Sequence, residues 1–245
     1  GVQRVVVNQM HRSPGVFFDH DKGKSHASGK LLFNCRVIPN RGSWLDFEYD
    51  VKDFLYFKID RKKKIFASTL LMALGYNKQD IVNEFYDKEQ FSIDAKTNKW
   101  KTKFNPDNYK AKNFSEEVVD LKTGKVVIKL GDKINFLTAK KLSSDGLKDI
   151  LVSQESLYGK FLHKEIKVSD EKEDIFGIGT ELNDTIIKKI LEANISTIDI
   201  SVTNSINKGP YLLTTLLNDK NNSKEDAITE IYKVLRPGEP PTIEI

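Results

Sequence analysis

The chain has 245 residues, 39% of them hydrophobic and 30% charged, a balance typical of a globular protein and unlike that of a disordered one. No apolar run approaches the roughly 18–20 residues that cross a bilayer, which argues against an integral membrane protein. The one cysteine, Cys35, can form neither an internal disulfide nor a multi-thiolate zinc site, and this predicts a reducing, cytoplasmic setting.

The net charge of +4 is unevenly distributed. Residues 1–64 hold 13 Lys and Arg against 7 Asp and Glu, whereas the remaining 181 residues hold 26 against 28. A basic first quarter predicts contact with a polyanion, although an ordinary domain with one basic face explains the count as well. The chain lacks an initiator methionine and a signal peptide and stops just after the segment 236–241, so we expect a piece of a longer protein.

The first 60 residues predict antiparallel strands. Apolar and polar side chains alternate over residues 31–38, again over 43–49 after a turn at Arg41-Gly42, and a third time over 55–59. In the second run the alternation puts Trp44 on the polar face with Asp46 and Glu48. The apolar side chains of that run occupy the other face.

Two short helices are expected next. The first covers residues 66–74 and ends at Gly75; the second begins at Asn77 and carries an apolar stripe of Ile81, Val82 and Phe85. A helix-turn-helix reading is disfavoured because the second helix is acidic. The polar, lysine-rich stretch 87–115 is a change of composition, and we place the start of a second domain at residue 87.

The second domain contains an internal repeat. Residues 126–153 align with 174–201 at an offset of 48, which matches Gly131 with Gly179 and Asn135 with Asn183. Both copies are expected to form strand, glycine turn, helix and strand. We predict helix caps at Thr138 and Asp184 and helix stops at Gly146 and Asn194.

Helices return after residue 205. Pro210 suits the first position of a helix through Leu217, and Ser223 with Asp226 predicts the start of another. The second of these helices is expected to bury Ala227, Ile228, Ile231 and Leu235.

These elements together predict an α+β fold in two domains. A discontinuous domain of antiparallel strands and short helices takes residues 1–86 and 204–245. It is interrupted by an inserted β-rich domain of duplicated strand-helix-strand units over residues 87–203.

Among the usual catalytic patterns, the sequence has neither a glycine-rich phosphate loop nor a nucleophile-elbow serine. The strongest enzyme-like cluster is His11, Asp19, His20, Asp21 and His26. It could hold a divalent metal in a small hydrolase, but its spacing matches no usual ligand motif and a merely polar loop explains it equally well.

A second group of residues fits nucleic acid. Basic side chains can neutralise phosphates, and an indole beside them can stack an unpaired base. The alternative for Trp44 is that it fills a gap under a neighbouring loop. The residues of this group are Arg12, Lys24, Arg41, Trp44, Arg61, Lys62 and Lys63.

Long motifs of the chain resemble the β subunit of bacterial RNA polymerase. They are QMHRSPGVFF at 9–18, IPNRGSWLDFE at 38–48, IDRKKK at 59–64, NKGPY at 207–211 and IYKVLRPGEPP at 231–241. All of them fall in the outer domain. Residues 87–203 match more loosely, as a lineage-specific insertion of the proteobacterial type would.

The resemblance implies a DNA-contacting lobe that forms one wall of the DNA cleft. It implies that Trp44 stacks on an unpaired non-template base, that Arg12 helps to build a guanine pocket, and that Lys24 and residues 61–63 lie near DNA. Val7 and Gln9 fall where the family lines the rifamycin pocket. Lys62 and Lys63 replace arginines of relatives, which keeps the charge and loses the bidentate geometry.

The resemblance also implies the assembly. Catalytic Mg²⁺ belongs to the partner β′ subunit in this family, so no cofactor and no catalytic residue are expected in this segment. Expected partners are the β′, α and ω subunits, a σ factor and DNA at the nucleoid, with secondary-channel regulators on residues 87–203. Two alternatives stay open: the metal-dependent hydrolase, and a purely structural docking module.

Overall fold

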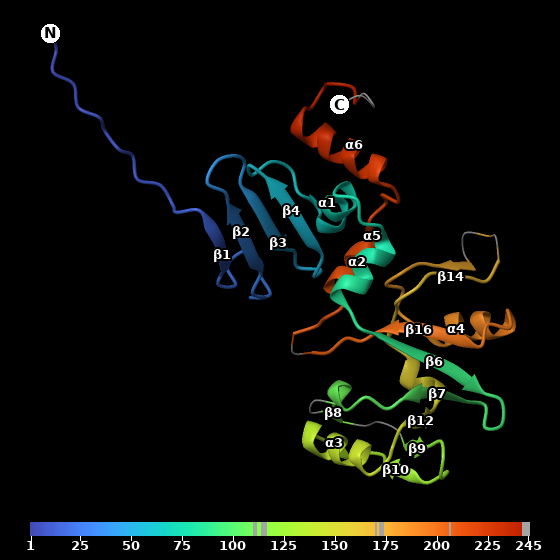
Figure 1. The fold of residues 1–245 in the computed structure, drawn as a ribbon. Coiled ribbons are helices and arrows are strands. Elements are labelled where there is room, and N and C mark those ends of the chain that lie inside the picture. The colour runs from blue at the N-terminus through green and yellow to red at the C-terminus, as the bar shows by residue number, and fades with distance from the viewer. Residues whose placement is uncertain (110–111, 114–116, 170, 172–173, 206, 242–245) are drawn as a thin grey trace. The chain divides into compact units, whose positions relative to one another are not determined.

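A computed structural model describes residues 1–109, 112–113, 117–169, 171, 174–205 and 207–241. The chain divides into two compact units (Figure 1). Unit 1 comprises residues 1–75 and 221–245, and unit 2 comprises residues 76–220. In the described part of the chain, no helix combines the length and apolar character that crossing a membrane requires.

Unit 1 is built on a five-stranded antiparallel sheet in the order β1-β2-β3-β4-β5, with one helix on either side of the interruption in its sequence. Its elements are β1 (Gly15–His20), β2 (Phe33–Ile38), β3 (Leu45–Tyr49), β4 (Leu55–Ile59), β5 (Ile65–Phe66), α1 (Ala67–Ala73) and α6 (Lys224–Leu235). The antiparallel strands expected from the alternation are therefore confirmed, and β4 has the predicted bounds.

The register of the sheet separates an apolar from a polar face. Cys35, Phe47 and Phe57 are direct cross-strand neighbours on one face, and Phe57 is fully buried. Arg36, Asp46 and Lys58 are neighbours on the other. Toward β1 the apolar face opens to solvent, and the Phe18 side chain is 82% exposed.

Helices α1 and α6 pack against each other, and α1 also contacts β4. Gly75, at φ +105°, follows α1 as the predicted stop. The Ser223 side chain accepts the Asp226 amide hydrogen and caps α6, as predicted. Ala227 is fully buried, but Ile228 is 43% exposed, so the prediction that Ile228 is buried was wrong: it lies outside the face of α6 that packs.

Unit 2 contains a seven-stranded antiparallel sheet in the order β10-β9-β12-β7-β6-β16-β13, two further two-stranded ladders, β11-β8 and β14-β15, and four α-helices among its described residues. Its strands are β6 (Lys88–Asp94), β7 (Lys99–Lys103), β8 (Lys112–Asn113), β9 (Val118–Asp120), β10 (Val126–Ile128), β11 (Lys133–Ile134), β12 (Asp149–Val152), β13 (Phe161–Leu162), β14 (Ile166–Lys167), β15 (Ile175–Phe176) and β16 (Thr197–Ser201). Its helices are α2 (Lys78–Phe85), α3 (Phe136–Ser144), α4 (Asp184–Glu192) and α5 (Tyr211–Asn218), with 3-10 turns η1 (Pro106–Asn108) and η2 (Gln154–Leu157). One cluster of buried side chains, Trp100 and Ile198 among them, forms its core.

The two copies of the repeat fold alike around α3 and α4. Asn135 and Asn183 are the N-caps, each accepting an amide hydrogen three residues on, so the caps predicted at Thr138 and Asp184 were wrong. The short asparagine side chain readily accepts a hydrogen bond from the N3 amide, and asparagine is therefore among the preferred N-cap residues. The helix ends match as well: Leu147 N–H donates to Leu142 O, and 48 residues later Ile195 N–H donates to Ile190 O.

Helices α2 and α5 both belong to unit 2, although the sequence predicts them in the outer domain. Asn77 caps α2, so the predicted start of this helix is confirmed; the cap is a reciprocal capping box with Asp80, and Ile81 is buried. Phe85 is 50% exposed and so departs from the predicted apolar stripe. Pro210 is the N-cap of α5 rather than its first helical residue. The evolutionary limits of the insertion, drawn at 87 and 203, stay a prediction.

The matched glycines of the repeat allow a test of how α5 docks. Gly131 and Gly179 have nearly equal φ values of +84° and +86°, but a Cβ on Gly179 would lie 2.2 Å from the Leu213 oxygen of α5, and one on Gly131 meets nothing within 4 Å. Gly131→Ala should lower the free energy of unfolding by about 1–2 kcal/mol, the cost of a left-handed alanine. Gly179→Ala should cost clearly more. Urea denaturation followed by Trp100 fluorescence in a Trp44→Phe background measures both, and equal losses would contradict the close contact.

His163 lies in a buried polar network of unit 2 and is 2% exposed. Its Nδ1 is 2.9 Å from Ser201 Oγ and its Nε2 is 2.9 Å from Asn83 Oδ1. Because Asn83 Oδ1 only accepts, Nε2 carries the proton and Nδ1 accepts from the serine hydroxyl. Burial, together with Lys88, lowers the pKa of His163, and the carboxylates of Asp199 and Asp87 oppose that shift.

The network predicts a pH dependence for unit 2. A folded-state pKa below the unfolded value of about 6.5 means that the unfolded chain binds more protons in that window, so stability is present above pH 6.5 and declines as the pH falls below it. Urea midpoints followed by Trp100 fluorescence should decrease from pH 7 to pH 5. His163→Gln should be less stable at pH 7 and lose most of this slope. An unchanged slope in the variant would assign the pH dependence to other groups.

Candidate nucleic-acid interface

Trp44 immediately precedes β3, and its backbone is held by one residue, Asp60. Its amide N–H donates to Asp60 Oδ1 at 2.8 Å, and the Asp60 N–H donates back to Trp44 O at 2.9 Å. Hydrogen bonds from the Ser43 hydroxyl and the Trp44 amide, with the charge of Lys62, lower the pKa of Asp60. The anchor of Trp44 is therefore an ionised carboxylate at neutral pH.

A hollow opens beside the indole. It has a volume of about 370 Å³ and is lined by Gly42, Trp44, Asp60 and Arg61. Asp60 and Arg61 form the turn after β4 with φ values of +47° and +59°, and both line the hollow at the start of β3. The Trp44 side chain, which the alternation in the sequence puts on the polar face, is half-buried.

Arg12 belongs to an extended N-terminal segment, residues 1–14, that has no regular structure and is exposed along its length. Its guanidinium carbon lies 4.1 Å from the centre of the Phe17 ring, a cation–π contact. Val7 and Gln9 are exposed in the same segment, and the drug-pocket role implied for them stays a prediction.

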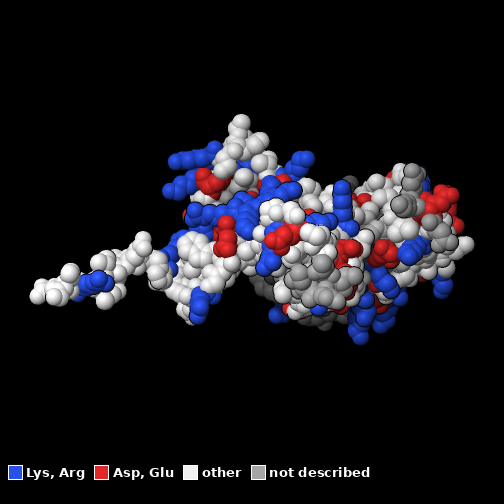
Figure 2. Space-filling view, turned by 90° about the horizontal axis from the view of Figure 1, so that it is seen from above, with Lys and Arg blue, Asp and Glu red and all other residues white. Residues whose placement is uncertain are grey.

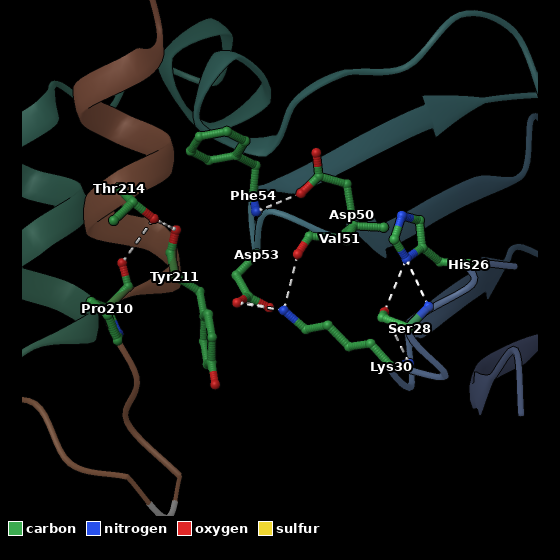
Figure 3. Close-up of polar contacts among 10 residues, drawn as sticks. All are labelled: His26, Ser28, Lys30, Asp50, Val51, Asp53, Phe54, Pro210, Tyr211 and Thr214. Atoms are coloured by element: carbon green, nitrogen blue, oxygen red, sulfur yellow. Dashed lines mark hydrogen bonds and ion pairs between the residues drawn. The ribbon is translucent and has the colours of Figure 1, made fainter. Parts of the chain in front are cut away.

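Lys24 lies in a turn organised by Asp21. The Asp21 carboxylate accepts amide hydrogens from Leu32, Gly23 and Ser25. The Leu32 amide, followed by the Ser25 hydroxyl and the Gly23 amide, strongly lowers the pKa of Asp21. Farther along the same connection Lys30 Nζ donates to Asp53 Oδ2 at 2.7 Å and to Val51 O at 3.0 Å (Figure 3). Asp21 therefore fixes the loop on which Lys24 is exposed.

The basic run after β4 has mixed roles. Lys62 Nζ donates to Leu235 O at the C-terminal end of α6, at 2.8 Å, and Lys64 Nζ lies 4.3 Å from the centre of the Tyr56 ring. The side chains of Arg41, Arg61 and Lys63 are exposed. Figure 2 shows blue basic side chains crowded together beside the extended N-terminal segment. The structure thus brings Trp44 and Arg61 together, leaves Lys63 at the surface and gives Lys62 a structural contact.

The histidine cluster forms local turn contacts instead of a metal site. His20 Nδ1 accepts the Lys22 N–H, and His26 Nδ1 lies 2.9 Å from Ser28 Oγ (Figure 3). Across the residues that the structure describes, no three His, Cys, Asp or Glu side chains gather closely enough to hold a metal ion. The described residues therefore provide no metal-binding cluster for the metal-dependent hydrolase considered as an alternative.

Two residues that contact Trp44 were not predicted from the sequence: Asp60 and Arg36. The guanidinium carbon of Arg36 lies 5.4 Å from the centre of the Trp44 ring. Arg36 is also paired with Asp46 across β2 and β3. The alternation puts Asp46 on the same face as Trp44. A basic residue on the neighbouring strand that could pair with Asp46 was therefore the signal in the sequence that pointed to Arg36.

The anchoring role of Asp60 predicts a change in the environment of Trp44. Asp60→Ala removes the acceptor of the Trp44 amide, so acrylamide should quench Trp44 fluorescence more strongly. The other tryptophan, Trp100, is 1% exposed and contributes little quenching. Asp53→Ala is the matched control, because Asp53 is also a turn residue at positive φ (+65°). Equal quenching in the two variants would mean that Asp60 does not hold Trp44.

The chain is similar in sequence to proteins of one known family. The family described as RNA polymerase Rpb2, domain 2, matches residues 12–143. Over 244 residues the chain is 45% identical to the DNA-directed RNA polymerase subunit beta of Rickettsia felis and 46% identical to that of Caulobacter vibrioides, in each case covering all of this chain and 18% of the relative. The chain therefore spans about a fifth of the length of these relatives. With more than half of its residues matched, it belongs to the RNA polymerase Rpb2 domain 2 family, in the lobe region of the bacterial β subunit.

Proposed function

We propose that the chain works as the lobe of a bacterial RNA polymerase β subunit in DNA-templated RNA synthesis, and that unit 1 contacts DNA around Trp44. In this proposal the indole stacks on an unpaired base of the non-template strand. Arg12 contributes to a guanine pocket close by. The polymerising chemistry, with its Mg²⁺, takes place on the partner β′ subunit.

The observation that carries the proposal is the hollow next to Trp44. The backbone of Trp44 is held at both its N–H and its C=O, and its indole is half-buried. The indole is therefore a preorganised surface on which a flat ring can stack. The hollow of about 370 Å³ provides room beside it, and Arg61 brings a cation to its wall. Stacking of a base on an aromatic side chain contributes about 1–3 kcal/mol and tolerates any base.

The exposed basic side chains of unit 1 support the proposal that the DNA phosphate backbone is contacted around that site. Lys24, Arg41 and Lys63 can neutralise phosphates, which would make binding depend on salt. Lys62 is a weaker candidate, because its ammonium group already bonds to Leu235 O. The expected subunit partners, the docking of secondary-channel regulators on unit 2, and the cytoplasmic, nucleoid-associated location belong to the same proposal.

The test is polymerase reconstituted with a full-length β subunit that carries Trp44→Ala. On templates with a base at the stacked non-template position, open-complex lifetime should fall by about 5-fold to 150-fold, the loss of roughly 1–3 kcal/mol of stacking. On a template abasic at that position the lifetime should not change. Trp44→Phe, which keeps an aromatic ring, should retain part of the effect.

The contrary result is equally definite. If Trp44→Ala assembles and behaves like the parent enzyme on every template, the stacking role is wrong. The lobe would then act on DNA by charge alone.

A further inference from the structure

Arg36 and Asp46 form a bidentate pair on the polar face of the unit 1 sheet. They are direct cross-strand neighbours of β2 and β3. Arg36 Nε lies 2.5 Å from Asp46 Oδ1, and a terminal guanidinium nitrogen lies 3.2 Å from Oδ2. The pair is partly buried, with side-chain exposures of 30% for Arg36 and 13% for Asp46. Two parallel bonds fix the plane of the guanidinium as well as its position.

The same guanidinium contacts Trp44. Its carbon lies 5.4 Å from the centre of the indole ring, within the range of a cation–π contact. Trp44 immediately precedes β3 and Asp46 is the second residue of that strand, so the two-residue spacing directs both side chains toward the same face. Asp46 therefore orients Arg36, and Arg36 lies against Trp44.

The hollow beside Trp44 is bordered by other residues. Gly42, Asp60 and Arg61 line it with the indole, and Arg36 is not part of that lining. The guanidinium thus supports the indole without occupying the space that a base would take. Asp60 holds the backbone of Trp44, which leaves the side-chain torsions to be restrained by other contacts.

We infer that Arg36, held by Asp46, is a positioning residue that fixes the indole of Trp44 for base stacking, an inference that rests on the proposed function. Fixing the ring in advance reduces the entropy lost when a base stacks on it. The planar guanidinium of Arg36 is essential to this role. A lysine at position 36 would keep the charge, but it could neither bind Asp46 through two parallel hydrogen bonds nor stack on the indole ring.

The test uses reconstituted polymerase with a full-length β subunit that carries Arg36→Lys. Asp46 keeps a cationic partner in this variant, so no buried charge is left alone. We expect open-complex lifetime to fall about threefold to fivefold on templates with a base at the stacked position. On the abasic template it should equal that of the parent enzyme. Combined with Trp44→Ala, the substitution should add nothing, because the two residues act through one contact.

A matched control lies one strand away. Lys58 on β4 pairs with Glu48 of β3 at 2.7 Å, with exposures of 29% and 30%, on the same face of the sheet. Lys58→Arg makes an equally conservative exchange in a pair that does not touch Trp44. It should leave the lifetime unchanged on both templates.

The outcomes separate this inference from the proposed function. If Trp44→Ala shortens the lifetime and Arg36→Lys does not, the positioning role is overturned and the stacking proposal stands. If Arg36→Lys shortens the lifetime equally on the abasic template, or Lys58→Arg has the same effect, the pair acts through the fold and the inference is overturned. If Trp44→Ala itself has no effect on any template, the proposed function fails first.

Discussion

The register of β3 between β2 and β4 is the constraint on which the rest of unit 1 depends. It aligns Cys35, Phe47 and Phe57 on one face and Arg36, Asp46 and Lys58 on the other. A slip by one residue would exchange the faces, placing Trp44 among apolar side chains and Asp46 against the core. The strand pairing therefore decides both what the sheet buries and what it presents to a ligand.

The turn after β4 adds what the register alone cannot provide. Its two residues at positive φ, Asp60 and Arg61, return the chain to the start of β3. There the Asp60 carboxylate meets the Trp44 amide, and Arg61 reaches the wall of the hollow. A local turn and a long-range pairing thus act on the same tryptophan, one through its backbone and the other through the face on which its side chain projects.

Much of this architecture follows from alternation and punctuation in the sequence. The strands β2, β3 and β4, the stop at Gly75 and the Asn77 and Ser223 caps all rest on local signals, which act over a few residues. Helix packing depends on distant partners, and this is why the exposure of Phe85 and Ile228 escaped prediction. The same limit applies at the site: Trp44 was found from its own strand, whereas Asp60 and Arg36 required knowledge of which strands and turns meet it.

Unit 1 is closed by contacts between its two separate stretches of sequence. Lys62 Nζ donates to Leu235 O, Asn221 Nδ2 bonds to Thr69 Oγ1 at 3.2 Å, and α1 packs on α6. The points at which the chain leaves and re-enters this unit are therefore joined through its own core. The entropy of closing a loop grows only with the logarithm of its length, so a loop at this junction can lengthen greatly at small thermodynamic cost. Such a junction is a permissive site for evolution, where whole domains can be gained, enlarged or lost between lineages while the surface around Trp44 is preserved.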